Sequence, residues 1–246
     1  IWSEEYLSFD QVPQPAHVPF LHNSSLSTMY RIFSREKTTE FLHEQAQIIR
    51  KYSKAPITHN SCFEFGIDNE KVFENLDFAG VDGYPAYDNY QSFLMKYDYW
   101  RNLKKGKGFW VMETSPSHAG ALTSYAKVHP NGYLVAEAVA AYALGAQGFC
   151  YWLWRQQRAG CEQPHSSVIS AWGDPGVGYP NVLELEKARK ILEPIFTSTI
   201  PEQAELAITY SDMAKVFLLT EPHRGIRYRD MITKLHTQVL ELGIHR

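Results

Sequence analysis

The chain has 246 residues, of which 44% are hydrophobic and 21% charged, with 24 Lys and Arg against 27 Asp and Glu. This composition is typical of a globular protein with one large domain and a substantial core. The net charge of −3 argues against a nucleic-acid partner and an anionic membrane surface, and no apolar run is long enough to span a bilayer. Cys62, Cys150 and Cys161 lack CxxC spacing, which argues against a structural zinc site or disulfide framework here, and free cysteines favour a cytoplasmic location.

The first 34 residues show little periodicity and contain Pro13, Pro15 and Pro19. They predict a long, structured excursion that includes a polar loop at 22–25. A helix is predicted from about 36 to 52. Its inward stripe is expected to comprise Phe41, Gln45, Ile48 and Tyr52, with Leu42 and Ile49 alongside.

Four short apolar segments then alternate with helical segments, which is the pattern of repeated β/α units. The strands are predicted to end at Asn60, Asp82, Glu113 and Trp154, and the helices to cover about 68–75, 89–103, 133–144 and 182–192. Four such units make half of an eight-stranded barrel. A doubly wound open sheet is the alternative, but no glycine-rich phosphate loop follows any strand. A strand at 205–210 and a helix at 226–242 predict that a second α/β domain begins there, so the chain reads as a piece of a longer one.

Glu113 is the strongest candidate for chemistry. It ends the apolar run 109–112 and is followed by loop residues that include Pro116. Burying a carboxylate is costly unless something compensates, and the carboxyl ends of barrel strands are where catalytic groups lie. Capping a nearby helix or pairing with an arginine is the structural alternative.

The other predicted strand ends also carry polar or aromatic groups, and a loop after the last strand contains an acid and a histidine three residues apart. Groups that converge at one barrel rim are typical of a substrate pocket, although each alone could be structural. Glu162 and His165 suit sugar hydroxyls as acceptor and donor, or a hydrogen bond that stabilises the loop. No HExxH or other metal pattern accompanies them. These further candidates are Asn60, Asp82, Tyr84, Arg155, Glu162 and His165.

The order of several motifs resembles glycoside hydrolase family 42, the β-galactosidases, over nearly the whole chain. These motifs are Trp-Ser at 2–3 with Tyr6, Ile-Thr-His-Asn at 57–60, Val-Asp-Gly-Tyr-Pro at 81–85, Met-Glu-Thr-Ser-Pro-Ser at 112–117, Tyr-Trp-Leu-Trp-Arg-Gln at 151–156 and Glu-Gln-Pro-His at 162–165. The resemblance implies a (β/α)₈ TIM barrel, with its later half at 1–198, followed at 199–246 by the start of a flavodoxin-like domain through which the full-length protein forms a homotrimer.

The resemblance also implies a retaining hydrolase of terminal non-reducing β-D-galactosides with Glu113 as nucleophile. The acid/base glutamate and a four-cysteine zinc cluster are expected upstream, so no cofactor is expected within this chain and this piece alone is expected to be inactive. Glu5, in Ser-Glu-Glu-Tyr, is a weak match to the acid/base motif because Trp2 and Tyr6 fit a later segment better.

The remaining roles implied by the resemblance concern binding. Trp2 and Tyr84 would stack on the galactose, Glu162 and His165 would bind its hydroxyls, and Asn60, Asp82 and Arg155 would hold this geometry. One departure is that the chain has Ala-Gly-Ala-Leu-Thr at 119–123 where the family often has Asn-Trp. A related glycosidase for arabinosides or fucosides therefore stays open, as does a non-catalytic sugar-binding barrel.

Overall fold

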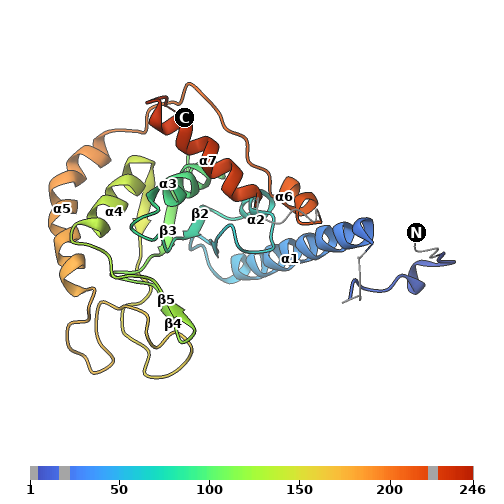
Figure 1. The fold of residues 1–246 in the computed structure, drawn as a ribbon, viewed down its shortest axis with the longest axis horizontal. Helices are drawn as coiled ribbons and strands as arrows, with labels where there is room; N and C mark the ends of the chain where they lie inside the picture. The colour runs from blue at the N-terminus through green and yellow to red at the C-terminus, as the bar shows by residue number, and fades with distance from the viewer. Residues whose placement is uncertain (1–4, 17–22, 221–226, 246) are drawn as a thin grey trace.

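The computed structural model describes residues 5–16, 23–220 and 227–245. At its centre is a four-stranded parallel sheet (Figure 1) in the order β1-β2-β3-β6. Its strands are β1 (Asn60–Ser61), β2 (Ala79–Asp82), β3 (Phe109–Glu113) and β6 (Ala146–Phe149). The helices that follow them in turn are α2 (Asn69–Glu74), α3 (Tyr90–Trp100), α4 (Tyr133–Ala143) and α5 (Tyr179–Ser198).

The predicted alternation of strands and helices is confirmed. Each strand of the four-stranded sheet lies beside the previous one in chain order, as in a (β/α)₈ barrel. A doubly wound sheet reverses its order at a switch point, and the four strands described here show no such reversal.

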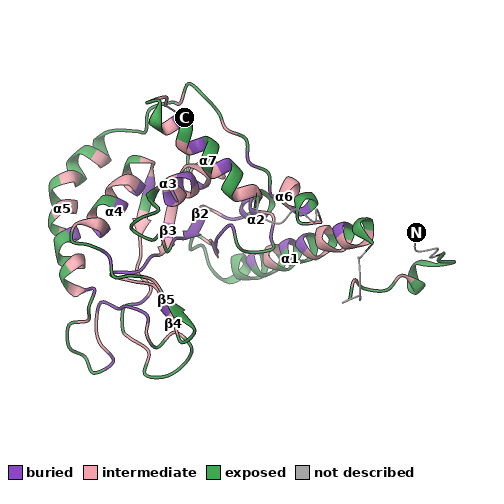
Figure 2. Cartoon of the chain, viewed as in Figure 1, coloured by how far each residue is buried: buried purple, intermediate pink, exposed green. Residues whose placement is uncertain are grey.

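The core lies between this sheet and its helices, where Figure 2 shows most of the buried residues. Phe109 and Val111 of β3 are fully buried, while Trp110 and Met112, which alternate with them, are half-buried. The indole nitrogen of Trp100 donates to the carbonyl of Gly80 at 3.0 Å and ties α3 to β2. The sheet is thus fixed from its helical side, which holds its strand ends in place.

Helix α1 (Ser24–Tyr52) begins twelve residues earlier than predicted and extends away from the sheet (Figure 1). Its start is set by Asn23, whose side-chain oxygen accepts from the amide of Leu26 at 2.9 Å. This is an N-cap. The segment predicted as a polar loop therefore contains the helix start.

The predicted inward stripe of α1 is wrong. Phe41, Ile48 and Tyr52 are 57%, 55% and 87% exposed, and Gln45 and Ile49 are exposed with them. The helix packs instead through Thr28, Arg35, Thr39 and Ala46, with Leu42 half-buried beside them. On this face Arg35 donates to the carbonyl of Asp212 at 2.7 Å, a long-range contact that the local sequence pattern does not reveal.

The fourth strand is shorter than predicted. Just beyond β6 the chain still bonds to the β3 segment, since the amide of Cys150 donates to Val111 at 2.8 Å and that of Trp152 to Thr114 at 2.9 Å. From Leu153 it pairs with its own later loop, where the amide of Val168 donates to Leu153 at 3.1 Å and that of Ile169 donates to Trp154 at 2.7 Å. The loop after β3 contains a small antiparallel hairpin of β4 (Gly120–Ala121) and β5 (Ser124–Tyr125). Both loops emerge at the carboxyl edge of the sheet.

The loop after β3 also contacts the start of α5. Asn181 donates to the carbonyl of Pro116 at 2.9 Å. A Cβ placed on Gly178 would lie 2.4 Å from the Cβ of Pro116, so the two backbones approach as closely as a glycine permits.

After α5 the chain continues through α6 (Asp212–Leu218), which was not predicted, to α7 (Tyr228–Glu241), which confirms the last predicted helix within the described residues. The strand predicted at 205–210 is wrong. Among the residues that the structure describes, this segment pairs with no strand, and the amides of Glu205 and Leu206 donate instead to the carbonyl of His245, each at 3.3 Å. In the amino-terminal stretch the described residues form one turn of 3₁₀ helix, Phe9–Gln11. Within the described ranges, no helix has the length and apolar character needed to cross a bilayer.

Candidate active site

Glu113 lies at the carboxyl end of β3, where an apolar strand gives way to the loop sequence Thr-Ser-Pro-Ser. The hydroxyl of Tyr84 donates to Glu113 Oε2 at 2.5 Å. The amide Nδ2 of Asn60 donates to Glu113 Oε1 at 3.3 Å. Both carboxylate oxygens are therefore oriented by donors from the two preceding strand ends, and Glu113 neither caps a helix nor pairs with an arginine in the described part of the chain.

Asp82, at the end of β2, shares the Asn60 amide with Glu113. Asn60 Nδ2 donates to Asp82 Oδ2 at 2.9 Å. Burial, followed by the nearby charge of Glu113, raises the pKa of Asp82 from 3.8 to about 7. A protonated Asp82 adds no second negative charge beside Glu113. The two carboxyl groups can therefore lie close enough to share the Asn60 amide without repelling each other.

The loop after β6 brings an imidazole to the same place. The ring of His165 meets that of Tyr84 edge-on, with centroids 5.4 Å apart. Burial lowers the pKa of His165, which favours the neutral ring. Its loop is fixed by the hydroxyl of Ser166, which accepts from the amides of Ser117 and His118 at 3.1 and 2.9 Å. The loop after β3 therefore supports the loop that carries the histidine.

Glu162 is held in the same loop by an indole. Trp152 Nε1 donates to Glu162 Oε2 at 3.2 Å, and Gln157 lies 3.5 Å from the same oxygen. Burial is the main reason that the pKa of Tyr84 is raised, and the charge of Glu162 makes a small further contribution.

Two predicted residues lie elsewhere, and a third cannot be compared. Arg155 donates to the carbonyl of Ala171 at 3.0 Å and makes no hydrogen bond to the carboxylates in the described part of the chain. Glu5 is exposed in the amino-terminal segment. Trp2 lies outside the described residues. The structure thus brings together Glu113, Tyr84, Asn60, Asp82, Glu162 and His165.

Sequence reasoning missed a buried group behind this site. Glu137, on α4, has no exposed surface and accepts from the hydroxyls of Tyr97 and Thr114. The available signal was a single acid within the nearly all-apolar sequence Tyr-Leu-Val-Ala-Glu-Ala-Val-Ala-Ala-Tyr-Ala. A charge at such a position requires buried partners.

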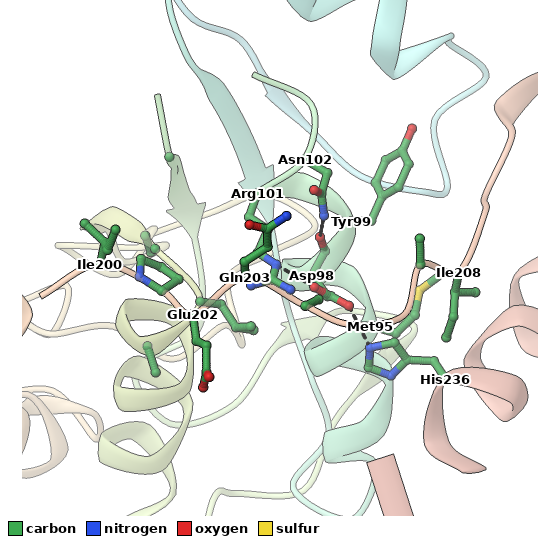
Figure 3. A pocket seen from close by; sticks show the side chains of 18 of the residues that line it. Met95, Asp98, Tyr99, Arg101, Asn102, Ile200, Glu202, Gln203, Ile208 and His236 are labelled. Atoms are coloured by element: carbon green, nitrogen blue, oxygen red, sulfur yellow. Dashed lines mark hydrogen bonds and ion pairs between the residues drawn. The ribbon is translucent and has the colours of Figure 1, made fainter. Parts of the chain in front are cut away.

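A cavity of about 1210 Å³ lies at the opposite end of the sheet (Figure 3). It is lined by Gly108 and Ala146, at the amino ends of β3 and β6, and by the segment 199–210. Among its charged side chains, Asp98 lies 2.6 Å from Arg101 and 3.1 Å from His236. This space is therefore remote from Glu113. No group of three or more His, Cys, Asp or Glu side chains in the described ranges is arranged to hold a metal ion.

A parallel sheet with its strands in chain order and carboxylates at the carboxyl ends of its strands is the arrangement of a (β/α)₈ barrel enzyme. The family model described as β-galactosidase, glycoside hydrolase family 42, matches residues 1–192. The chain belongs to this family.

Its curated relatives include the β-galactosidase YesZ of Bacillus licheniformis, which is 61% identical over 246 residues, covering 100% of this chain and 37% of the relative. YesZ of Bacillus subtilis is 58% identical with the same coverage. The chain thus spans little more than a third of their length. Among solved structures, the β-galactosidase of Rahnella sp. R3 superposes with a TM-score of 0.85 at 23% identity, covering 99% of this chain and 37% of that one. This likeness supports the barrel fold.

Proposed function

We propose that the protein containing this chain hydrolyses terminal non-reducing β-D-galactosides with retention of configuration. Glu113 attacks the anomeric carbon as the leaving oxygen is protonated, and a covalent glycosyl-enzyme forms. Water then releases the sugar. The acid/base partner, which retaining enzymes keep about 5–5.5 Å from the nucleophile, is provided by a glutamate upstream of residue 1.

The observation that carries this proposal is the orientation of Glu113 by Tyr84 and Asn60 at the end of a buried parallel strand. A nucleophile needs a fixed direction of attack, and two donors supply it. Tyr84 stays protonated because burial and the adjacent Glu113 raise its pKa. Its hydroxyl can therefore donate a hydrogen bond to the carboxylate throughout the physiological pH range.

The galactose is bound by the loop that follows β6. Glu162 accepts from sugar hydroxyls and a neutral His165 donates to or accepts from them. Trp2 and Tyr84 provide apolar ring surface, and Asn60 and Asp82 maintain the direction of Glu113. Arg155 acts indirectly by joining two parts of the loop through Ala171.

The relatives' names favour galactose over other sugars, since YesZ of both Bacillus species is called a β-galactosidase. The assembly follows the family expectation: residues 199–246 open a flavodoxin-like domain and the full-length protein is a homotrimer. Any zinc site lies upstream, with no cofactor bound by this chain. The protein works in the cytoplasm.

The test is to express the complete reading frame and incubate the protein with an activated 2-fluoro-galactoside. We expect a stable adduct on the peptide containing Glu113, located by mass spectrometry, and none in Glu113→Gln. Parallel incubation with fluoro-sugars of the arabino and fuco series compares sugar classes. Labelling elsewhere would refute Glu113 as nucleophile, and labelling by none of the sugars would favour a sugar-binding barrel.

A further inference from the structure

Glu137 is a fully buried carboxyl group that the proposed reaction does not use. Its Oε1 accepts from the hydroxyl of Tyr97 at 2.7 Å and from that of Thr114 at 3.0 Å. None of these three side chains has exposed surface. Burying an acid is unfavourable even when it is hydrogen-bonded, and an apolar residue would pack in the same volume without that cost. The placement of its two donors indicates what Glu137 does.

One donor lies directly behind the nucleophile. Thr114 follows Glu113 in the chain, and its backbone is fixed on one side, since its amide donates to Cys150 at 3.1 Å and its carbonyl accepts from Trp152 at 2.9 Å. The hydroxyl bond to Glu137 fixes the remaining direction, toward α4. Glu113 is thus attached to a residue that is held from two sides.

The other donor lies behind Tyr84. The Tyr97 hydroxyl is so close to Gly83 that a Cβ placed there would approach it to 2.9 Å. Gly83 precedes Tyr84, and its amide donates to the carbonyl of Glu113 at 2.8 Å. Tyr97 therefore packs against the backbone just before Tyr84 and limits how far this segment can move toward α3.

We infer that Glu137 is a positioning residue, which connects the supports of Glu113 and Tyr84 through Thr114 and Tyr97 and so fixes the direction of the nucleophile. This inference rests on the proposed role of Glu113. Misplacing a reacting group by about 1 Å can reduce a rate about 100-fold. Loss of the connection should therefore slow attack, while sugar binding by the loop after β6 stays intact.

The test uses Thr114→Val in the protein from the complete reading frame, because valine has the shape of threonine without its hydroxyl. The maximal rate of labelling by the 2-fluoro-galactoside and its half-saturating concentration are measured separately. We expect the maximal rate to fall about 10- to 100-fold at an unchanged half-saturating concentration, and Thr114→Ser to restore it. Thr123→Val, at an exposed threonine of the same loop, is the matched control.

Three outcomes are informative. Wild-type labelling of Glu113 with equal rates in Thr114→Val would overturn the positioning role and leave the proposed nucleophile standing. Absence of wild-type labelling would remove the proposed nucleophile and this inference with it. If Thr114→Val does not fold, Tyr97→Phe removes the other hydroxyl and must show the same loss in maximal rate, and an unchanged rate in that variant would overturn the inference.

Discussion

The hydroxyl of Tyr84 donates to Oε2 of Glu113 across 2.5 Å, and the ring of His165 abuts the same tyrosine. A short bond from a hydroxyl to a carboxylate is among the stronger hydrogen bonds in proteins. Glu113 ends β3, whereas Tyr84 and His165 come from the loops after β2 and β6 at the same edge of the sheet. A single tyrosine therefore connects the proposed nucleophile with the proposed sugar-binding loop.

Tyr84→Phe should therefore reduce kcat while leaving the fold intact. The variant keeps the ring that contacts His165 but removes the proton that orients Glu113. We expect kcat to fall by about 100-fold, comparable to the loss of a preorganised donor elsewhere, with a small change in KM. Steady-state hydrolysis of nitrophenyl galactoside measures both. Tyr90→Phe, at an exposed tyrosine, should match wild type, and wild-type kcat in Tyr84→Phe would contradict the proposed orientation.

Asn60→Asp should be more damaging. The substitution replaces the shared amide donor with a third acid beside Asp82 and Glu113. Like charges at this spacing repel and force proton uptake, so we expect a loss of at least about 100-fold in kcat/KM, measured with the same substrate. Asn89→Asp, at an exposed asparagine, controls for the change in charge. Equal effects of the two substitutions would argue against a bridging role for Asn60.

The stability of the protein should fall as the pH rises from about 4 to about 7. The pKa of Asp82 is raised from 3.8 to about 7, chiefly by burial. Between these values the native state holds a proton that the unfolded chain has released, so the free energy of unfolding decreases by up to about 1.4 kcal/mol per pH unit for this group. Above about pH 7 this contribution is constant.

Urea denaturation of the complete protein at pH 5, 6, 7 and 8 measures this slope. Asp82→Asn should reduce it, because the variant cannot titrate at this position, whereas Asp174→Asn, at an exposed aspartate, should leave it intact. Glu137, whose burial raises its pKa to about 7, contributes a slope of the same sign. An unchanged slope in Asp82→Asn would contradict the raised pKa.

Asp212→Ala should destabilise the fold by about 2–4 kcal/mol. Asp212 Oδ2 accepts from the backbone amide and side-chain nitrogen of Asn69 at 3.0 and 2.9 Å, and both residues are buried. Removing the acceptor leaves these donors without a partner. The free energy of unfolding, from urea denaturation, tests this. Asp88→Ala, at an exposed aspartate, should change it by less than about 0.5 kcal/mol.

The parallel sheet, and the meeting of several polar strand ends at one of its edges, could be predicted from the sequence. Strand ends are marked by a change from apolar to polar residues, as at Asp82 and Glu113, and the carboxyl ends of parallel strands meet at one edge. Local pattern alone therefore placed Asn60 and Tyr84 near Glu113. It could not show that Tyr84 donates to Glu113, since that depends on how the loop after β2 turns.

The errors arose where distant contacts overrule local pattern. The apolar residues Phe41 and Ile48 predicted the buried face of α1, but the helix buries another face, on which Arg35 donates to Asp212. A strand was predicted at 205–210 because the pattern of strand and helix begins again there. A strand also needs a neighbouring strand to pair with, and the described chain offers this segment none. Glu137 was missed because its burial becomes evident only with its partners Tyr97 and Thr114, which are distant in the sequence.

The close approach of Gly178 to Pro116 imposes a steric limit on the chain. A methyl group at position 178 would act as a wedge between the start of α5 and the loop after β3. Displacement of that loop would carry Ser117 and His118 with it, and their amides hold Ser166, the neighbour of His165. Gly178, which lies outside the site, thus limits where the loop after β3 can lie, and through that loop it affects the position of the His165 imidazole.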